Sequence, residues 1–182
     1  KAIVINPDYA EAHNNLGNIM KSHDRLEDAE ASFRKAIVIN PDYAEAHNNL
    51  GNIMKSHGRL EDAEKSYREA IALDPDYSEA HNNLGNIMKS HDRLEDAEVS
   101  FRKAIAIKPD YAQAYSNLGA NFKKLGKLAD AESNCRKAID LDQKYTQAHC
   151  NLCLILYANG DFDSAIQCIE KANSINPKSK TI

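Results

Sequence analysis

Residues 10–43 read AEAHNNLGNIMKSHDRLEDAEASFRKAIVINPDY, and residues 78–111 repeat this stretch with four substitutions. Prolines recur at the same 34-residue interval, at Pro7, Pro41, Pro75 and Pro109. A fixed period of this length is typical of arrays in which each unit packs only against its neighbours. Such an array offers a long surface in place of a deep pocket, so the period predicts a chain that binds other molecules and is not an enzyme.

The period organises the whole chain, residues 1–182, as a single array. The five complete units are expected to span 10–43, 44–77, 78–111, 112–145 and 146–179, with 1–9 as the end of a preceding unit and 180–182 as a tail. Residues 1–6 have the same sequence, KAIVIN, as residues 35–40, and the first residue is not Met. We therefore expect the chain to begin within a helix and to be part of a longer protein.

The composition predicts a water-soluble chain, with 42% apolar and 27% charged residues. No run approaches the roughly 18 consecutive apolar residues that a membrane-spanning helix needs, so a membrane is not an expected partner. Lys and Arg total 23 against 27 Asp and Glu, and the net charge of −4 provides no basic face for phosphates. Nucleic acid is therefore not an expected partner either.

Each unit is predicted to contain two helices. The Asp-x-x-Glu spacing of a capping box occurs twice, at Asp8 with Glu11 and at Asp24 with Glu27. Pro41 follows an apolar run and is expected to end the second helix, because proline lacks the N–H that a helix interior uses. Glycine suits a tight corner between the helices and stands there in three units, as Gly58, Gly126 and Gly160.

At about 100° per residue, the first helix separates into a packing face and a polar face. The packing face is expected to comprise Ala12, Leu16, Ile19, Met20 and His23. The second helix has an apolar stripe made of Ala29, Phe33, Ala36 and Ile37. Because small residues let helices approach closely, bulky replacements should be badly tolerated at Ala29, Ala63, Ala97, Ala131 and Ala165.

These residues resemble the tetratricopeptide repeat family, whose pattern appears here as Leu16, Gly17, Ala29, Phe33, Ala36 and Pro41, and again as Leu50, Gly51, Ala63, Tyr67, Ala70 and Pro75. The departures are His13, Met20, Cys135, Gln143 and Cys153. The resemblance implies an all-α fold, a right-handed superhelical α-solenoid of tandem helix-turn-helix repeats. It also implies a concave groove that is lined by the first helices and commonly holds a peptide.

One asparagine on the polar face occurs at the sixth position of every unit, as Asn15, Asn49, Asn83, Asn117 and Asn151. A carboxamide both donates and accepts, so a row of them can satisfy the backbone of an extended peptide. The row resembles the asparagine ladder of protein O-linked N-acetylglucosamine transferases. Further candidate contacts on the same face are Asn14, Asn48, Asn82, Asn18, Asn52, Asn86, Lys21, Lys55 and Lys89. The alternative is that these asparagines are solvated or cap neighbouring backbone.

The carboxylate clamp of chaperone-binding family members is not expected, because Glu11, Glu45 and Glu79 occupy one of its lysine positions. The fourth and fifth units instead place Ala120, Lys123, Lys124, Cys150, Leu154, Tyr157 and Ala158 at groove positions. These residues predict either an apolar subsite for a ligand side chain or a surface that a segment after Ile182 covers.

Seven histidines and four cysteines do not predict a metal site or any cofactor. His13, His47 and His81 recur once per unit, about 8–10 Å apart if the helices pack normally, whereas a shared zinc needs each nitrogen at about 2 Å. Cys150 and Cys153 form a Cys-x-x-Cys motif, but buried free cysteine usually behaves as a small apolar residue. Unpaired thiols favour a reducing compartment, so we expect a cytoplasmic protein.

Three hypotheses about function follow. The first is a scaffold that binds a protein or an extended peptide through the asparagine-lined groove. The second is the substrate-recruiting arm of a larger enzyme, such as a glycosyltransferase, whose catalytic part is another domain. The third is a self-assembly module in which arrays associate end to end. The sequence contains no Gly-rich phosphate loop and no nucleophile-base constellation, so no catalytic residue is predicted.

Overall fold

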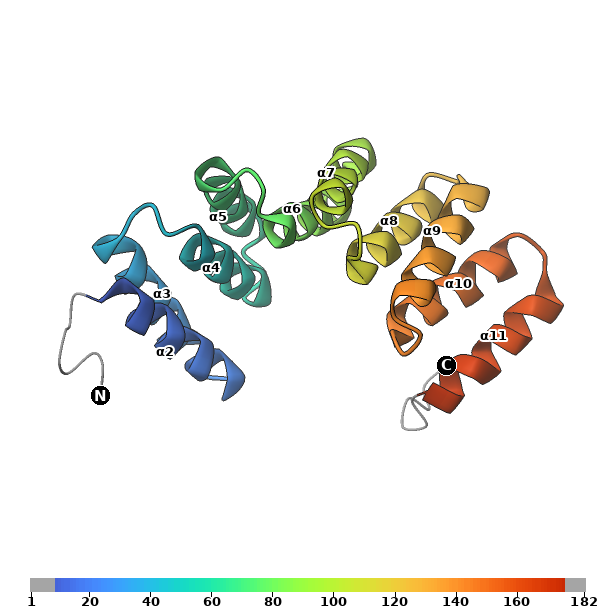
Figure 1. Cartoon of the computed structure of the whole chain (residues 1–182), viewed down its shortest axis with the longest axis horizontal. Helices are drawn as coiled ribbons and strands as arrows, with labels where there is room; N and C mark the ends of the chain where they lie inside the picture. Colours follow the sequence, from blue (N-terminus) through green and yellow to red (C-terminus); the bar gives the residue numbers. More distant parts are fainter. Residues whose placement is uncertain (1–8, 176–182) are drawn as a thin grey trace. The chain divides into compact units, whose positions relative to one another are not determined.

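The structure is a computed structural model that describes residues 9–175. These residues form ten α-helices, labelled as in Figure 1, and no strand. The helices are α2 (Ala10–Ser22), α3 (Leu26–Ile39), α4 (Ala44–Ser56), α5 (Leu60–Leu73), α6 (Ser78–Ser90), α7 (Leu94–Ile107), α8 (Ala112–Lys124), α9 (Leu128–Leu141), α10 (Thr146–Ala158) and α11 (Phe162–Ile175). Within this part of the chain, no helix has the length and apolar character to cross a bilayer.

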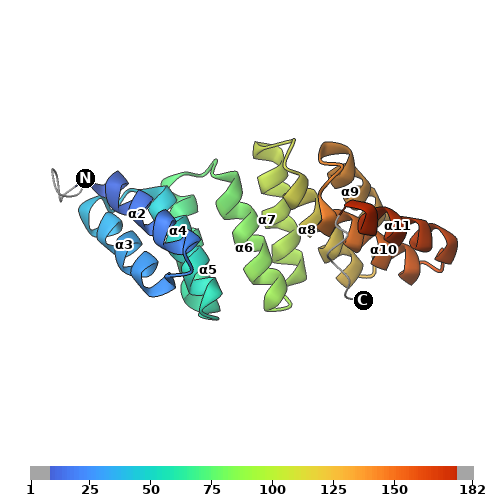
Figure 2. The ribbon, with the colours of Figure 1, turned by 90° about the horizontal axis from the view of Figure 1, so that it is seen from below.

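The chain divides into two compact units, Lys1–Ile87 and Met88–Ile182, which we describe separately as unit 1 and unit 2. Unit 1 contains α2 to α5 and most of α6, and unit 2 contains the end of α6 and α7 to α11. Both views show α2 beside α3 in unit 1 and α10 beside α11 in unit 2 (Figures 1 and 2). The predicted all-α fold of tandem helix-turn-helix repeats is confirmed. Residues 1–9 were predicted to be the end of a preceding repeat and residues 180–182 a tail. Of these residues, the structure describes only Tyr9.

The two helices of a repeat are in close contact at the glycine of the first helix. A Cβ on Gly17 would lie 2.6 Å from Cε1 of Phe33, and a Cβ on Gly51 would lie 2.6 Å from Cε1 of Tyr67. In unit 2, a Cβ on Gly119 would lie 2.5 Å from the Sγ of Cys135. Glycine is therefore needed here because it has no side chain, which leaves room for the core residue of the second helix.

The core of each second helix matches the predicted stripe. Ala29, Phe33 and Ala36 are fully buried in α3, and the equivalent residues of α5, α7 and α9 are fully buried as well. Each repeat also packs on the next, since α4 contacts α3, α8 contacts α7 and α10 contacts α9. Ile53 of α4 is buried, whereas its counterpart Ile19 of α2 is exposed.

The corners between the helices correct one detail of the prediction. Asp24 does not cap α3: the N-cap residue is Arg25, and it makes no side-chain capping hydrogen bond. Asp24 instead has φ +57°, the left-handed conformation that Gly58 adopts at +72° in the next repeat. The N–H of Arg25 reaches back to the carbonyl of Met20 at 3.0 Å, as in a Schellman motif. This corner therefore requires a positive φ, and an N-cap side chain is not used.

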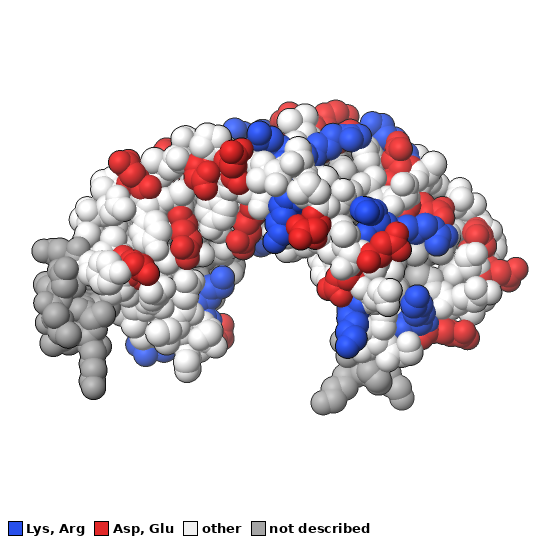
Figure 3. Space-filling view, in the orientation of Figure 1, with Lys and Arg blue, Asp and Glu red and all other residues white. Residues whose placement is uncertain are grey.

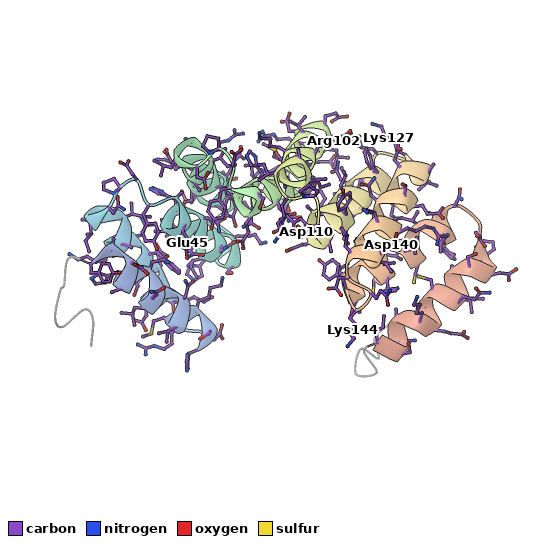
Figure 4. The ribbon with its side chains drawn as sticks, in the orientation of Figure 1. Glu45, Arg102, Asp110, Lys127, Asp140 and Lys144 are labelled. Carbon is purple, nitrogen blue, oxygen red and sulfur yellow. The ribbon has the colours of Figure 1, made fainter. Side chains whose placement is uncertain are left out.

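Ion pairs connect consecutive repeats on the surface. Arg59 reaches Glu30 at 3.4 Å in unit 1, and Lys127 reaches Glu98 at 3.4 Å in unit 2. Burial would raise the pKa of Glu98, but hydrogen bonds from Arg102 and Lys127 lower it below its ordinary value. Arg102 and Lys127 are labelled in Figure 4, and both cations lie over the ring of Phe122, at 5.6 and 5.4 Å. Each exposed pair contributes about 0–1 kcal/mol.

We expect Gly51→Ala to lower the free energy of unfolding by about 1–3 kcal/mol, because the new methyl group overpacks a buried contact. The Tyr67 ring is fully buried and has no space into which to move. Urea denaturation followed by circular dichroism measures the change. Lys65→Ala, at an exposed position of α5, is the control and should stay within about 0.5 kcal/mol. An unchanged stability of the Gly51 variant would contradict the close contact.

We expect Asp24→Gly to stabilise the chain by up to about 1 kcal/mol, because glycine adopts a positive φ without steric cost. The same gain is expected for Asp92→Gly, since Asp92 has φ +58°. Gly58→Ala should shift stability by a similar amount in the opposite direction. Thermal unfolding of the three variants tests the corner geometry. A loss of stability in both Asp24→Gly and Asp92→Gly would show that these corners do not require a positive φ.

Candidate functional site

The candidate site is the polar face of the first helices, and in unit 1 it lies on α2, α4 and the part of α6 up to Ile87. The fifth-position asparagines Asn14, Asn48 and Asn82 are buried. Asn49 and Asn83, at the sixth position, are each 8% exposed, and Asn15 is exposed. The buried asparagines are therefore placed to support their neighbours, and direct contact with a ligand is left to residues nearer the surface.

A hydrogen-bonded chain of side chains joins the first two repeats. The Nδ2 of Asn49 donates to the Oδ1 of Asn14 at 3.0 Å. The Nδ2 of Asn14 donates in turn to the Oε1 of Glu45 at 2.9 Å and to the Oη of Tyr43 at 3.4 Å. Both ends of the Asn14 carboxamide are therefore engaged, as a buried amide requires. Glu45 is labelled on α4 in Figure 4.

The same arrangement recurs one repeat later. The Nδ2 of Asn83 donates to the Oδ1 of Asn48 at 3.0 Å, and the Nδ2 of Asn48 donates to the Oη of Tyr77 at 3.3 Å. Asn83 also donates to the Oδ1 of Asn52 at 3.3 Å, and that oxygen accepts from Tyr67 at 2.9 Å. The predicted asparagine row is thus part of the contact between repeats, a role that neither solvation nor backbone capping describes.

The oxygens of the two sixth-position asparagines face outward. Within residues 9–175, the Oδ1 of Asn49 and the Oδ1 of Asn83 accept no hydrogen bond from the protein, yet neither atom is sealed from solvent. Donation by Nδ2 to the preceding repeat fixes the orientation of each carboxamide. Unit 1 therefore presents two oriented acceptors, one repeat apart, on its first-helix face.

The remaining predicted residues of the face differ in exposure. Asn18 is half-buried, Lys21 and Lys55 are exposed, and Asn86 donates to the carbonyl of Asn82 at 3.1 Å. In unit 2, Lys89 is half-buried and lies 5.6 Å from the centre of the Phe101 ring. The structure therefore leaves Lys21 and Lys55 the most accessible of these side chains.

Unit 2 keeps the contact between repeats with different residues. The Nδ2 of Asn151 on α10 donates to the Oγ of Ser116 at 3.0 Å and to its carbonyl at 3.3 Å. The Oδ1 of Asn151 accepts from Gln147 at 3.1 Å. Asn117 on α8 is half-buried. Ser116 thus takes the place that Asn14 and Asn48 have in unit 1, and the Asn151 carboxamide is engaged at both ends.

Two cavities in unit 2 involve the residues that distinguish the fourth and fifth repeats. One of about 330 Å³ lies on the first-helix face and is lined by Lys89, Ala120, Lys123, Lys124, Asn151 and Leu154. A second of about 660 Å³ lies on α10 and α11, and its apolar lining includes Cys150, Cys153, Leu154, Tyr157, Phe162 and Ile166. The segment predicted to follow Ile182 and cover these residues is outside the described part.

The histidines and cysteines have structural partners. The Nε2 of His47 contacts the carbonyl of Pro41 at 2.9 Å, and the Nε2 of His81 contacts that of Pro75 at 3.0 Å, so these rings hold the turn between repeats. Cys135, Cys153 and Cys168 are buried, and Cys150 is half-buried. Burial raises the pKa of the Cys135 thiol to about 12. Residues 9–175 contain no group of three or more His, Cys, Asp or Glu side chains that could hold a metal ion.

Family models match almost the whole chain. A model described as TPR repeat matches residues 21–58, 51–92 and 89–126, and models described as tetratricopeptide repeat match residues 1–31 and 123–181. The chain belongs to the tetratricopeptide repeat family. No curated protein matches the sequence.

Solved tetratricopeptide repeat structures share the fold. YrrB, described as a TPR protein with an unusual peptide-binding site, is 21% identical with a TM-score of 0.72, over 98% of this chain and 92% of that one. PilF of Pseudomonas aeruginosa is 24% identical with a TM-score of 0.84, over 92% and 76% of the two chains. TTC0263, a thermophilic TPR protein of Thermus thermophilus, is 21% identical with a TM-score of 0.79, over 94% and 93%.

The cysteine environments predict an order of chemical reactivity. In the native chain at pH 8, we expect iodoacetamide to modify Cys150 first, because it is the most accessible of the four thiols. Cys135 should react only after unfolding, since burial keeps it protonated and out of reach. Mass spectrometry of the digested protein measures both rates. Equal rates for the two cysteines in the folded chain would contradict the buried placement of Cys135.

Proposed function

We propose that this tetratricopeptide repeat chain is a protein-interaction scaffold and that its first-helix face binds the backbone of an extended peptide. The observation that carries the proposal is the outward Oδ1 of Asn49 and of Asn83, each held in place by donation from its Nδ2 to the preceding repeat. Such an oxygen accepts a hydrogen bond from a peptide N–H whatever the peptide's side chains are.

The geometry refines the role of the asparagine row. In the hypothesis from the sequence, each carboxamide offers the ligand a donor and an acceptor. Asn83 uses its Nδ2 for Asn48 and for Asn52, at 3.0 and 3.3 Å, so the ligand is offered the acceptor. Because the carboxamides are already ordered in the free protein, a peptide that binds them loses less conformational entropy in the complex.

The family supports the class of partner. YrrB, which shares the fold, is described as having a peptide-binding site, and proteins of this family act in general without catalysis. We therefore propose a protein or peptide partner and no catalytic role. Asn117 and Asn151 remain predicted contacts in unit 2, where Asn151 is engaged by Ser116 and Gln147.

The test compares two double variants with the parent chain. We expect Asn49→Ala with Asn83→Ala to weaken binding to a pool of blocked, neutral ten-residue peptides about ten-fold, which corresponds to a loss of about 1.4 kcal/mol. Asn49→Asp with Asn83→Asp removes the same Nδ2 donors but keeps an oxygen on the face, so it should retain most of the binding. Quantitative mass spectrometry of the captured peptides provides the readout.

Stability is measured in parallel, because both double variants lose the bonds to Asn14 and Asn48. Because each substitution leaves the buried Oδ1 of Asn14 or Asn48 without its donor, it should cost about 1–3 kcal/mol of unfolding free energy. If the alanine and aspartate variants lose binding equally, the effect comes from the repeat contact and the acceptor role is wrong. If neither loses binding, the face does not use these oxygens at all.

A further inference from the structure

The first helices of the fourth and fifth repeats differ in charge from those of the other repeats. In the first three repeats, α2, α4 and α6 each contain one glutamate and one lysine. Neither α8 nor α10 contains an acidic residue, and α8 ends in Lys123 and Lys124. In a chain of net charge −4, the two lysines of α8 therefore have no carboxylate on their own helix. Figure 3 shows acidic side chains scattered over the visible face, with basic ones among them.

Three lysines line the cavity of about 330 Å³ in unit 2. Lys89, Lys123 and Lys124 lie there together with Ala120, Asn151 and Leu154. This volume is at the lower end of the range of about 300–1,000 Å³ that is common for ligand sites. The cavity is therefore large enough for one or two ligand side chains, and it offers two different kinds of contact.

Lys124 has an exposed, weakly held ionic partner within unit 2. The Nζ of Lys124 lies 3.8 Å from the Oδ1 of Asp92, and the Asp92 side chain is 84% exposed. Lys124 also contacts the carbonyl of Lys89 at 3.5 Å, which orders its amine near the cavity. A pair as exposed as Lys124 with Asp92 holds its lysine loosely, so an incoming carboxylate competes well with Asp92.

Exposed apolar side chains lie next to these amines. Leu154 lines the cavity and is 51% exposed, and Tyr157, one turn further along α10, is 67% exposed. The first three repeats have asparagine and lysine at these two positions, namely Asn18 with Lys21, Asn52 with Lys55 and Asn86 with Lys89. A large apolar residue in place of a polar one, beside lysines, is typical of a surface that covers a ligand side chain.

We propose that this cavity of unit 2 binds a peptide segment that carries a carboxylate side chain close to a large aliphatic one. The carboxylate lies among Lys89, Lys123 and Lys124, and the aliphatic side chain packs on Ala120 and Leu154. The proposal rests on the scaffold function, since both need the first-helix face to bind peptide. It adds a sequence preference, which the backbone contacts of unit 1 cannot provide.

The test uses fluorescein-labelled, end-blocked peptides and the full chain. The first peptide alternates two glutamates with two leucines. The second has glutamines and the third has lysines in place of the glutamates, and all three keep the leucines. By fluorescence anisotropy, we expect the parent chain to bind the glutamate peptide about ten-fold more tightly than the glutamine peptide. Lys123→Glu with Lys124→Glu should remove this preference and bind the lysine peptide more tightly than the parent does. A gain for the lysine peptide cannot result from misfolding.

Two controls complete the experiment. Lys65→Glu makes the same charge change at an exposed position of α5, away from the first-helix face, and it should leave the preference for glutamate unchanged. Leu154→Ala should weaken binding of the glutamate and the glutamine peptides to a similar extent. An unchanged preference in the Lys123 and Lys124 double variant, or an equal loss in the Lys65 variant, would overturn the proposal.

The outcome is distinguishable from a failure of the proposed backbone contacts. The alanine variant of Asn49 and Asn83 alters unit 1 only, so it should leave the preference for glutamate over glutamine intact. If that variant binds neutral peptides normally while the lysine variant loses the preference, the backbone role is wrong and the unit 2 site stands. If the lysine variant keeps the preference, the unit 2 site is wrong whatever the asparagine variants do.

Discussion

The close contact between the two helices of a repeat is the constraint on which the other features depend. Gly17 and Gly51 lie so near the rings of Phe33 and Tyr67 that no Cβ fits. With the ring fully buried between small residues such as Ala29 and Ala36, the helix pair has a single packed arrangement. One face of the first helix is thereby committed to the core. The opposite face remains available for the contact between repeats and for a ligand.

Under the proposed function, that remaining face serves both purposes through the asparagines. A buried amide must have its donors and acceptor satisfied, and Asn14 achieves this by accepting from Asn49 and donating to Glu45 and Tyr43. The hydrogen bond that joins the repeats also orients the outer carboxamide of Asn49. In this proposal stability and ligand contact are coupled at Asn49, and a variant that removes the side chain is expected to alter both. A residue ordered in this way is well suited to binding, because its rotamer is set before the ligand arrives.

Much of the fold follows from local patterns in the sequence, and the errors concern how the first helix ends and which residues the next repeat covers. The period, Pro41 and Gly58 predict helix pairs and their corners correctly. Asp24 was predicted to cap α3, but the preceding helix ends in a Schellman motif that places this residue at positive φ. The helical period places Asn14 on the polar side of its own helix. It is nevertheless buried, because Tyr43 and Asn49, later in the chain, lie against it. The periodicity of one helix contains no information about which part of its polar side the next repeat covers.

The comparison of the two units shows why the face can vary while the array stays intact. The contact between repeats needs only an acceptor at the fifth position, and Ser116 supplies one to Asn151 as Asn14 does to Asn49. In unit 1, Asn52, one turn further along α4, also accepts from Asn83, whereas the bond between Asn151 and Ser116 in unit 2 uses no residue one or two turns further along. In unit 2 these positions hold Lys123 and Leu154. Folding thus depends on a few fixed positions in each repeat, and in the proposed function other positions of the same face determine which peptide binds.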